Sequence, residues 1–187
     1  MTRDSPYDRY LEGDTRALSQ LQLEGLELFF TKAKCGACHN GPMLSDYRFI
    51  VQGVPQEGVG KKVFFRDDTG REEHTRNPAD RYAFRPLTLR NIADTGPYMH
   101  DGVFDTLEEV VRFYNDGARP RHPEVSDLIL DPVLHEPLDL SENEIHALVA
   151  FMEALSDERT PSTSVLFTVP DTVPSGLPPV VGLRAVP

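Results

Sequence analysis

Cys35-Gly36-Ala37-Cys38-His39 holds the only two cysteines of the 187-residue chain, and a histidine follows them directly. In a C-x-x-C-H motif the two thiols lie one helical turn apart and can bond to the two vinyl groups of a haem. The adjacent histidine then supplies an axial nitrogen to the iron. The motif therefore predicts one covalently bound haem c, with Cys35 and Cys38 as anchors and His39 as proximal ligand.

Three other uses of a C-x-x-C pair fit the surrounding sequence less well. A thioredoxin-like redox pair follows a strand in a βαβ unit, whereas the residues before Cys35 have a helical pattern. A structural zinc site needs a second ligand pair with its own short spacing, and the chain has no further cysteine. A disulfide between Cys35 and Cys38 would close a loop too short to be useful. Haem attachment is therefore the favoured interpretation.

Composition sets limits on the fold and on the partners. At 187 residues and 21.0 kDa the chain has the size of one domain. Hydrophobic residues make up 39%, and 16 prolines with 13 glycines indicate long loops. The net charge of −11 argues against a nucleic-acid partner and favours a redox partner protein with a basic face or a cationic substrate. No apolar run approaches the length of a membrane span.

Apolar periodicity and capping signals predict three helices. The first runs from residue 19 to about residue 34 and delivers the haem motif. The second begins at the capping box 106–109, ends at 115–117 and turns Tyr114 inward. The third begins at the capping box 141–144, and we expect it to pack on the first helix.

The remaining segments have weaker signals. Short strands are expected at 47–51 and 62–65, and residues 67–71 form a predicted turn. Ser5-Pro6 is interpreted as a turn signal. Arg85 and Arg90 lie in a polar loop and can pair with haem propionates, since guanidinium binds carboxylate through two parallel hydrogen bonds. Arg90 is the favoured partner, and the alternative that both arginines only solvate the loop stays open.

Several segments in a fixed order carry a family resemblance. They are Cys-x-x-Cys-His-x-Gly-Pro at 35–42, Asp-x-Gly-Arg at 68–71, Phe-Arg-x-x-Thr-Leu-Arg-Asn at 84–91, Thr-x-Pro-Tyr-Met-His-Asp-Gly at 95–102 and Thr-Leu-Glu-Glu-Val-Val-x-Phe-Tyr-Asn at 106–115. From about Ser5 to Leu155 the chain resembles the C-terminal haem domain of the di-haem cytochrome c peroxidase and MauG family.

This resemblance implies a mainly α fold, a class I cytochrome c-like haem domain with long loops and an extended C-terminal tail. Residues 1–18 would be an N-terminal extension, the remnant of an interdomain segment. Residues 19–158 would form the haem domain, and residues 159–187 are a tail rich in proline and valine.

The resemblance also implies a two-domain enzyme in which an N-terminal haem reacts with hydrogen peroxide and the C-terminal haem passes electrons to it. This chain has no second C-x-x-C-H and no tryptophan, which commonly lies between the haems. We therefore expect an electron relay to a peroxidatic haem domain or second subunit. The alternatives are a stand-alone mono-haem carrier and a haem whose distal ligand dissociates, giving weak peroxidase activity.

The sixth iron ligand separates the branches of the family. The peroxidases use a methionine and MauG a tyrosine, and the matching position in this chain is Tyr114. Phenolate is a hard anionic donor that stabilises ferric iron, so ligation by His39 and Tyr114 predicts a low reduction potential. Tyr114 as an ordinary core residue remains an alternative, as do the thioethers of Met99 and Met152 as ligands, whereas Met43 follows the haem motif too closely to reach the other face easily.

Other residues take lesser roles in this interpretation. His100 is expected to support a ligand or a propionate, and four further histidines are expected at the surface: His74, His122, His135 and His146. The family resemblance implies a partial calcium site at the carbonyls of Thr95 and Pro97, which this chain alone would bind weakly or not at all. Covalent haem attachment implies the periplasm, although residues 1–10 contain no apolar signal-peptide segment, so we expect the sequence to be incomplete at its N-terminus.

Overall fold

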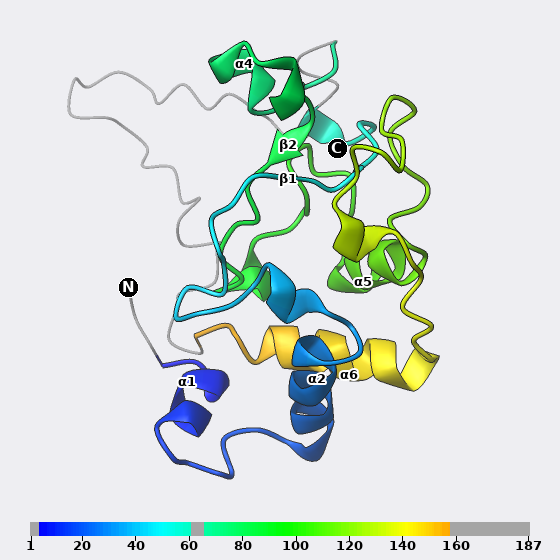
Figure 1. Cartoon of the computed structure of the whole chain (residues 1–187). Helices are drawn as coiled ribbons and strands as arrows, with labels where there is room; N and C mark the ends of the chain where they lie inside the picture. Colours follow the sequence, from blue (N-terminus) through cyan, green and yellow to red (C-terminus); the bar gives the residue numbers. More distant parts are fainter. Residues whose placement is uncertain (1–3, 61–65, 158–187) are drawn as a thin grey trace, which may run out of the picture.

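The computed structural model describes residues 4–60 and 66–157 (Figure 1). Helices hold most of the regular structure, long loops join them, and η marks a 3₁₀ helix. The elements follow in the order α1 (Pro6–Leu11), α2 (Gln20–Phe30), η1 (Cys35–Ala37), β1 (Ile50–Val51), α4 (Glu72–Thr75), η2 (Pro78–Asp80), β2 (Ala83–Phe84), η3 (Ile92–Asp94), α5 (Leu107–Asn115), η4 (Pro132–Leu134) and α6 (Glu142–Glu153). The described part is therefore mainly helical with long loops, as expected, and the tail at 159–187 lies outside the described residues.

Packing of α2 against α6 forms the main core, as the periodicity predicted (Figure 1). Phe29 and Phe151 meet edge to face, with their ring centroids 5.2 Å apart. Gly25 lets the two helices approach closely, because a Cβ at this position would overlap the carbonyl oxygen of Ala147. The predicted capping boxes are present at the start of α5 and α6.

The N-terminal segment differs from the prediction of a turn at Ser5-Pro6. These residues begin α1, because Ser5 and Asp8 form a capping box and proline is well suited to the first helical position. Tyr7 donates its backbone N–H to the Ala154 carbonyl at 3.1 Å, and its ring lies edge-on to Phe151. Residues 5–11 therefore pack against the end of α6.

The first predicted helix is shorter than expected. It ends at Phe30 rather than near Lys34, because the chain then turns back so that the Ala33 N–H bonds the Leu28 carbonyl. Lys34 has a left-handed backbone, with φ of 56°. The C-x-x-C segment therefore forms its own short 3₁₀ helix, η1, instead of continuing α2.

Two extended segments, 42–51 and 83–90, run antiparallel beside the haem motif. Their strand pairing covers only β1 and β2, so the predicted strand at 47–51 is confirmed in its last two residues, and the one at 62–65 lies outside the described residues. Beyond the strands, side chains bond to backbone carbonyls: Ser45 Oγ to Pro86 at 2.5 Å and Thr88 Oγ1 to Met43 at 2.6 Å. We call this pairing the 42–51/83–90 clamp.

A buried ion pair fastens the clamp to the N-terminal helix. Arg90 donates through Nε to the Pro42 carbonyl at 2.7 Å and through Nη1 to Asp8 Oδ2 at 2.8 Å. Both side chains are less than a tenth exposed. Burial by itself raises the pKa of Asp8, but the hydrogen bonds from Arg90 and Ser5 together hold that pKa below its usual value.

A second, smaller core surrounds the other face of α5. Its buried members come from loops as well as from the helix: Val54, Tyr82, Phe113, Ala118, Val125 and Leu130.

In the part of the chain that the structure describes, every helix is too short or too polar to cross a membrane.

Replacing Gly25 by alanine tests the close approach of α2 and α6. Alanine is intrinsically better than glycine in a helix by about 1 kcal/mol, so a loss of stability would report the clash with Ala147. We expect Gly25→Ala to lower the free energy of unfolding by about 1–3 kcal/mol, measured by chemical denaturation of the haem-loaded protein. The control Glu27→Ala, at an exposed position of the same helix, should change it by less than about 0.5 kcal/mol. Equal stability of Gly25→Ala and wild type would contradict this packing.

The pair between Asp8 and Arg90 predicts a specific acid sensitivity. The folded pKa of Asp8 is depressed. The ionised carboxylate therefore contributes fully to the free energy of unfolding above the usual pKa of 3.8, and this contribution is lost as the pH falls through the lower folded pKa. Asp8→Asn should therefore lower the melting temperature near neutral pH and flatten its decline below about pH 4. The control Asp14→Asn, at an exposed loop position, should retain the wild-type pH profile. Identical profiles for both variants would contradict a stabilising role of the pair.

Candidate functional site

The haem motif lies on η1, in the turn between α2 and the clamp. Residues three apart on a 3₁₀ helix eclipse one another, so Cys35 and Cys38 share one side. The backbone N–H groups of Cys38 and His39 both bond the Cys35 carbonyl, at 3.2 and 2.9 Å. Gly36 packs against the Phe30 ring, where a larger residue would collide with it. The local fold thus presents both thiols and His39 together.

These three residues line one pocket, together with Tyr114 from α5. The pocket has a cavity volume of about 60 Å³ and opens to solvent. Its remaining lining comes from α2–η1, β1 and the loop after α5: Ala33, Lys34, Ile50, Gln52, Val133, Leu134 and Leu138. The walls are mainly apolar.

A hydrogen bond to a backbone carbonyl orients His39. Its Nδ1 lies 3.0 Å from the Leu44 carbonyl oxygen, which can only accept, so the proton is assigned to Nδ1. Burial lowers the pKa of His39, opposed by this hydrogen bond and by Asp46. A neutral ring with its proton on Nδ1 leaves Nε2 as the metal-binding nitrogen.

The two cysteines are free thiols and are partly buried. Burial raises the pKa of Cys35 to about 12, and burial together with Asp46 raises the pKa of Cys38. Reactive redox pairs and zinc ligands instead depend on a lowered thiol pKa. The environment therefore favours covalent anchoring over thiolate chemistry.

Tyr114 reaches the pocket from the last turn of α5. Its hydroxyl accepts a hydrogen bond from Gln52 Nε2 at 3.1 Å, and burial raises its pKa. No methionine is among the described residues that line the pocket: Met152 is in the main core, and Met99 packs against the same second core as Tyr114. Tyr114 is thus the ligand candidate that the fold brings to the cysteines and His39.

The predicted propionate partners do not line this pocket in the described structure. Arg90 is held by Asp8 and the Pro42 carbonyl. Arg85 is exposed and lies over the rings of Tyr47 and Phe49. A role for either arginine toward propionates stays a prediction.

His100 lies in a second cavity, bordered also by Gln56, Asp68 and Asp101. Its ring stacks on Phe84 with centroids 3.9 Å apart, and burial lowers its pKa. Its buried Nε2 has no hydrogen-bond partner among the described residues. The proposed support of a haem ligand or propionate by His100 is likewise untested.

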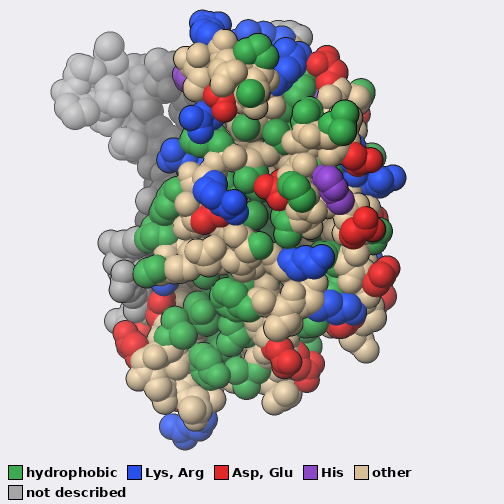
Figure 2. Space-filling model, in the orientation of Figure 1, with side chains coloured by type: hydrophobic (Ala, Val, Ile, Leu, Met, Phe, Trp, Pro, Cys, Tyr) green, Lys and Arg blue, Asp and Glu red, His purple; other side chains and the backbone are tan. Residues whose placement is uncertain are grey.

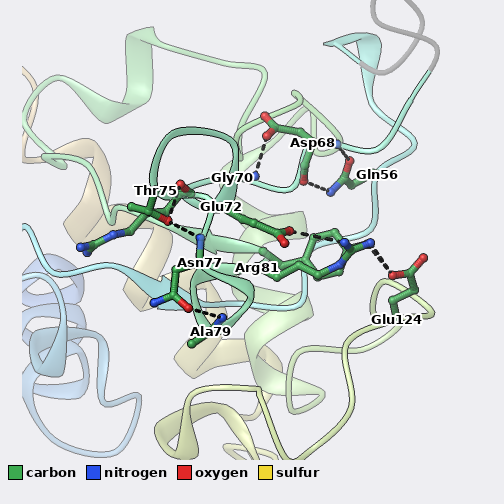
Figure 3. A network of polar contacts seen from close by, with 11 residues as sticks. Gln56, Asp68, Gly70, Glu72, Thr75, Asn77, Ala79, Arg81 and Glu124 are labelled. Carbon is green, nitrogen blue, oxygen red and sulfur yellow. Dashed lines mark hydrogen bonds and ion pairs between the residues drawn. The ribbon is translucent and has the colours of Figure 1, made fainter.

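A polar network shapes the wall of that second cavity (Figure 3). Gln56 and the backbone of Asp68 exchange two hydrogen bonds, of 2.6 and 2.7 Å, and the Asp68 carboxylate caps the Gly70 N–H. The turn predicted at 67–71 is therefore present. Arg81 links Glu72 to Glu124 across the same region.

Two further predictions concern groups outside the pocket. Thr95 and Pro97, the expected partial calcium site, are both exposed, and their role as ligands stays a prediction. His122 was expected at the surface, but it is 5% exposed because it packs against the Tyr82 ring and approaches Asp67.

Sequence reasoning missed most of the apolar lining and Gln52. Ile50 and Gln52 are two residues apart in an extended segment, so both face the pocket, a signal that alternation at 50–52 contained. Val133, Leu134 and Leu138 lie in a proline-containing loop without a period, and no comparable signal marked them.

The residues present fit a haem c. Two partly buried thiols, an imidazole nitrogen free of its proton, a tyrosine oxygen and mainly apolar walls match the donors and the surroundings that this cofactor needs. Anchored in this way, the cofactor would be held by side chains from η1, β1 and α5.

Comparison with known proteins also points to haem-containing peroxidases and MauG-like proteins. No family model matches the chain. It is 37% identical to the cytochrome-c peroxidase IdrP2 of Denitromonas iodatirespirans, over 93% of this chain and 49% of the relative. Its fold resembles a crystal structure of a MauG-like protein associated with microbial copper homeostasis (31% identity, TM-score 0.67, 84% of this chain and 53% of that one). It also resembles the diheme peroxidase BthA from Burkholderia thailandensis (26% identity, TM-score 0.66, 83% of this chain and 47% of that one).

The chain thus spans about half the length of the relatives that it matches. The resemblance extends beyond the C-x-x-C-H motif, since the matched share of this chain is above four fifths in each case. The resemblance predicted from the ordered sequence motifs is confirmed: over most of its length the chain is similar to cytochrome-c peroxidases and MauG-like proteins.

Proposed function

We propose that the chain is the haem c electron-transfer domain of a di-haem peroxidase or MauG-like oxidoreductase. The observation that carries this proposal is that Cys35, Cys38, His39 and Tyr114 line the same pocket. When bound there, a haem iron supplies one-electron chemistry by alternating between the ferric and ferrous states. The fold would be that of a class I cytochrome c-like domain.

The roles of the residues follow from their chemistry. Cys35 and Cys38 would anchor the haem, since each thiol can add across one vinyl group, with sulfur on one vinyl carbon and the thiol hydrogen on the other, without an oxidant. His39 offers Nε2 as the proximal ligand while the Leu44 carbonyl holds Nδ1. Tyr114 offers its oxygen as the distal ligand, and the Gln52 amide, which donates to that oxygen, would stabilise it as an anion.

If His39 and Tyr114 both held the iron, the site would relay electrons and would not itself react with peroxide. The peroxide-reactive haem would lie on a partner domain or second subunit, in keeping with a chain that spans half of its relatives. Haem c attachment favours a periplasmic location. A stand-alone electron carrier is the alternative, because the given sequence contains a single C-x-x-C-H motif. A partial calcium site at Thr95 and Pro97 would need ligands from the partner domain.

Replacing Tyr114 by phenylalanine tests the distal ligand. We expect the ferric spectrum to change from low-spin to high-spin and the reduction potential to rise, because an anionic donor that stabilises ferric iron is lost. Absorption and paramagnetic resonance spectra measure the first change, and a redox titration measures the second. The control Tyr98→Phe, whose hydroxyl bonds the Ile92 carbonyl, should leave both unchanged. An unaltered spectrum of Tyr114→Phe means that Tyr114 is not a ligand.

Steady-state peroxide turnover tests the relay. The purified, haem-loaded chain should reduce hydrogen peroxide no faster than an equal concentration of free haem, because the iron has no open position. Tyr114→Phe should gain measurable turnover, since it opens that position. Robust turnover by the wild-type chain would instead support the interpretation in which the distal ligand dissociates.

A further inference from the structure

The turn that follows the haem motif contains an exposed Asn-Gly pair, Asn40-Gly41. The amide carbon of an asparagine side chain can be attacked by the backbone nitrogen of the next residue, which closes a succinimide ring. Glycine hinders this attack least, because it has no Cβ and adopts the widest range of backbone angles. Gly41 has a φ of 67°, and a Cβ placed on it would meet no heavy atom within 4 Å. The approach to Asn40 is therefore open.

The nitrogen that would attack is not held by a hydrogen bond. Within residues 4–60 and 66–157, the Gly41 N–H has no acceptor. Asn40 Nδ2 donates to the Gly36 carbonyl at 3.1 Å, so the nitrogen that would leave is held and the attacking one is free. Both residues are exposed, which gives water access to the ring once it has formed.

Two Asp-Gly pairs could form the same ring, but their glycines are engaged. The Gly102 N–H donates to the Met99 carbonyl at 3.3 Å, and the Gly117 N–H donates to the Tyr114 carbonyl at 3.1 Å. Asp101, which precedes the first of these glycines, is also buried. A ring at either pair would have to break an existing contact of the turn.

The other four asparagines of the chain lack this combination of features. Asn77 precedes a proline, which has no N–H to attack. Asn91 and Asn115 each accept a backbone hydrogen bond of 2.8 Å through Oδ1. Asn143 lies in the first turn of α6, where the helix restricts its backbone. These residues are internal controls for the reactivity of Asn40.

We propose that Asn40 is a site of spontaneous deamidation. The Gly41 nitrogen bonds to Asn40 Cγ, the bond from Cγ to Nδ2 breaks, and ammonia leaves with the proton of the Gly41 N–H. Water then opens the ring at either carbonyl and gives aspartate or isoaspartate. An amide and water thus become a carboxylic acid and ammonia, without an oxidant or a reductant. Asparagine is among the thermolabile residues of proteins.

The isoaspartate product would change the turn that orients His39. The Asn40 carbonyl accepts a hydrogen bond from the Ser45 N–H at 3.0 Å. The Gly41 carbonyl accepts one from the Leu44 N–H, also at 3.0 Å, and the Leu44 carbonyl in turn holds His39 Nδ1. In isoaspartate the main chain is longer by one methylene group and the former carbonyl of residue 40 becomes a free carboxylate. This consequence rests on the proposed haem c function, whereas the modification itself does not.

The added charge is expected to matter less than the longer main chain. Residue 40 is exposed, so a carboxylate there stays solvated, and exposed charges contribute little to stability. Figure 2 shows acidic and basic side chains interspersed over the face that it presents, so one further carboxylate does not create a field of one sign. The variant Asn40→Asp, which has the charge but the normal main chain, separates the two effects.

Peptide mapping of the aged, haem-loaded protein tests the proposal. After incubation at mildly alkaline pH, mass spectrometry should find the peptide of Asn40 heavier by the difference between an amide and a carboxylic acid, with isoaspartate as the larger product. Because the next residue is glycine, the loss should be at least about tenfold faster than at Asn143, which is also exposed. An intact Asn40, or equal rates at Asn40 and Asn143, would overturn the proposal.

Two variants test the ring closure. Gly41→Ala places a Cβ beside the attacking nitrogen and should slow the loss about tenfold. Asn40→Gln keeps an amide but would need a larger ring, and it should lose no ammonia over the same period. Since alanine is strained at a left-handed φ, Asn40→Gln keeps the test independent of any folding defect in Gly41→Ala. Loss from Asn40→Gln at the wild-type rate would exclude the mechanism.

Ferric absorption spectra follow the effect on His39. The aged wild type should lose its original ligand signature in proportion to its isoaspartate content, whereas aged Asn40→Gln and fresh Asn40→Asp should retain it. An equal change in fresh Asn40→Asp would refute the role of the main chain. A chain without thioether-bound haem refutes the proposed function and leaves the peptide map valid. A map in which Asn40 persists refutes the modification, whatever the spectrum shows.

Discussion

The hydrogen bond from His39 Nδ1 to the Leu44 carbonyl is the contact on which the site depends, because it fixes both the ring and the position of its proton. A backbone carbonyl can hold an imidazole ring in place only if the carbonyl's own segment is rigid. Leu44 lies between the points where Met43 and Ser45 bond the opposing strand, and its side chain is buried. The 42–51/83–90 clamp therefore determines the geometry of His39.

The clamp also explains the spacing of polar residues in 84–91. Thr88 and Arg90 bond backbone carbonyls of the facing segment, while Arg85 lies over its rings. Only two residue pairs form a regular strand ladder, so most of the pairing is made by side chains. This arrangement joins the haem motif, the pocket wall and α1 into one unit through Asp8.

Sequence patterns predicted the features that depend on local signals. The capping boxes at Thr106 and Ser141 and the apolar faces of their helices are recognisable within a few residues, and α5 and α6 follow them. The same signal at Ser5 and Asp8 was overlooked, because Ser5-Pro6 also fits a turn. The clamp was not predictable in this way, since its hydrogen bonds join residues about 40 positions apart and such pairs leave no periodic pattern in the sequence.

Arg85 and Arg90 show why residue type alone does not give a role. Both are arginines of one short segment, and a cofactor with two carboxylates makes either a reasonable partner. Arg90 is less than a tenth exposed and faces a carboxylate that would be left buried and unpaired if it moved, which is costly. Arg85 is exposed, and within the described ranges its contacts are to aromatic rings. A cofactor carboxylate can therefore engage Arg85 without disturbing the clamp, whereas engaging Arg90 would require breaking one of the contacts that hold α1 in place.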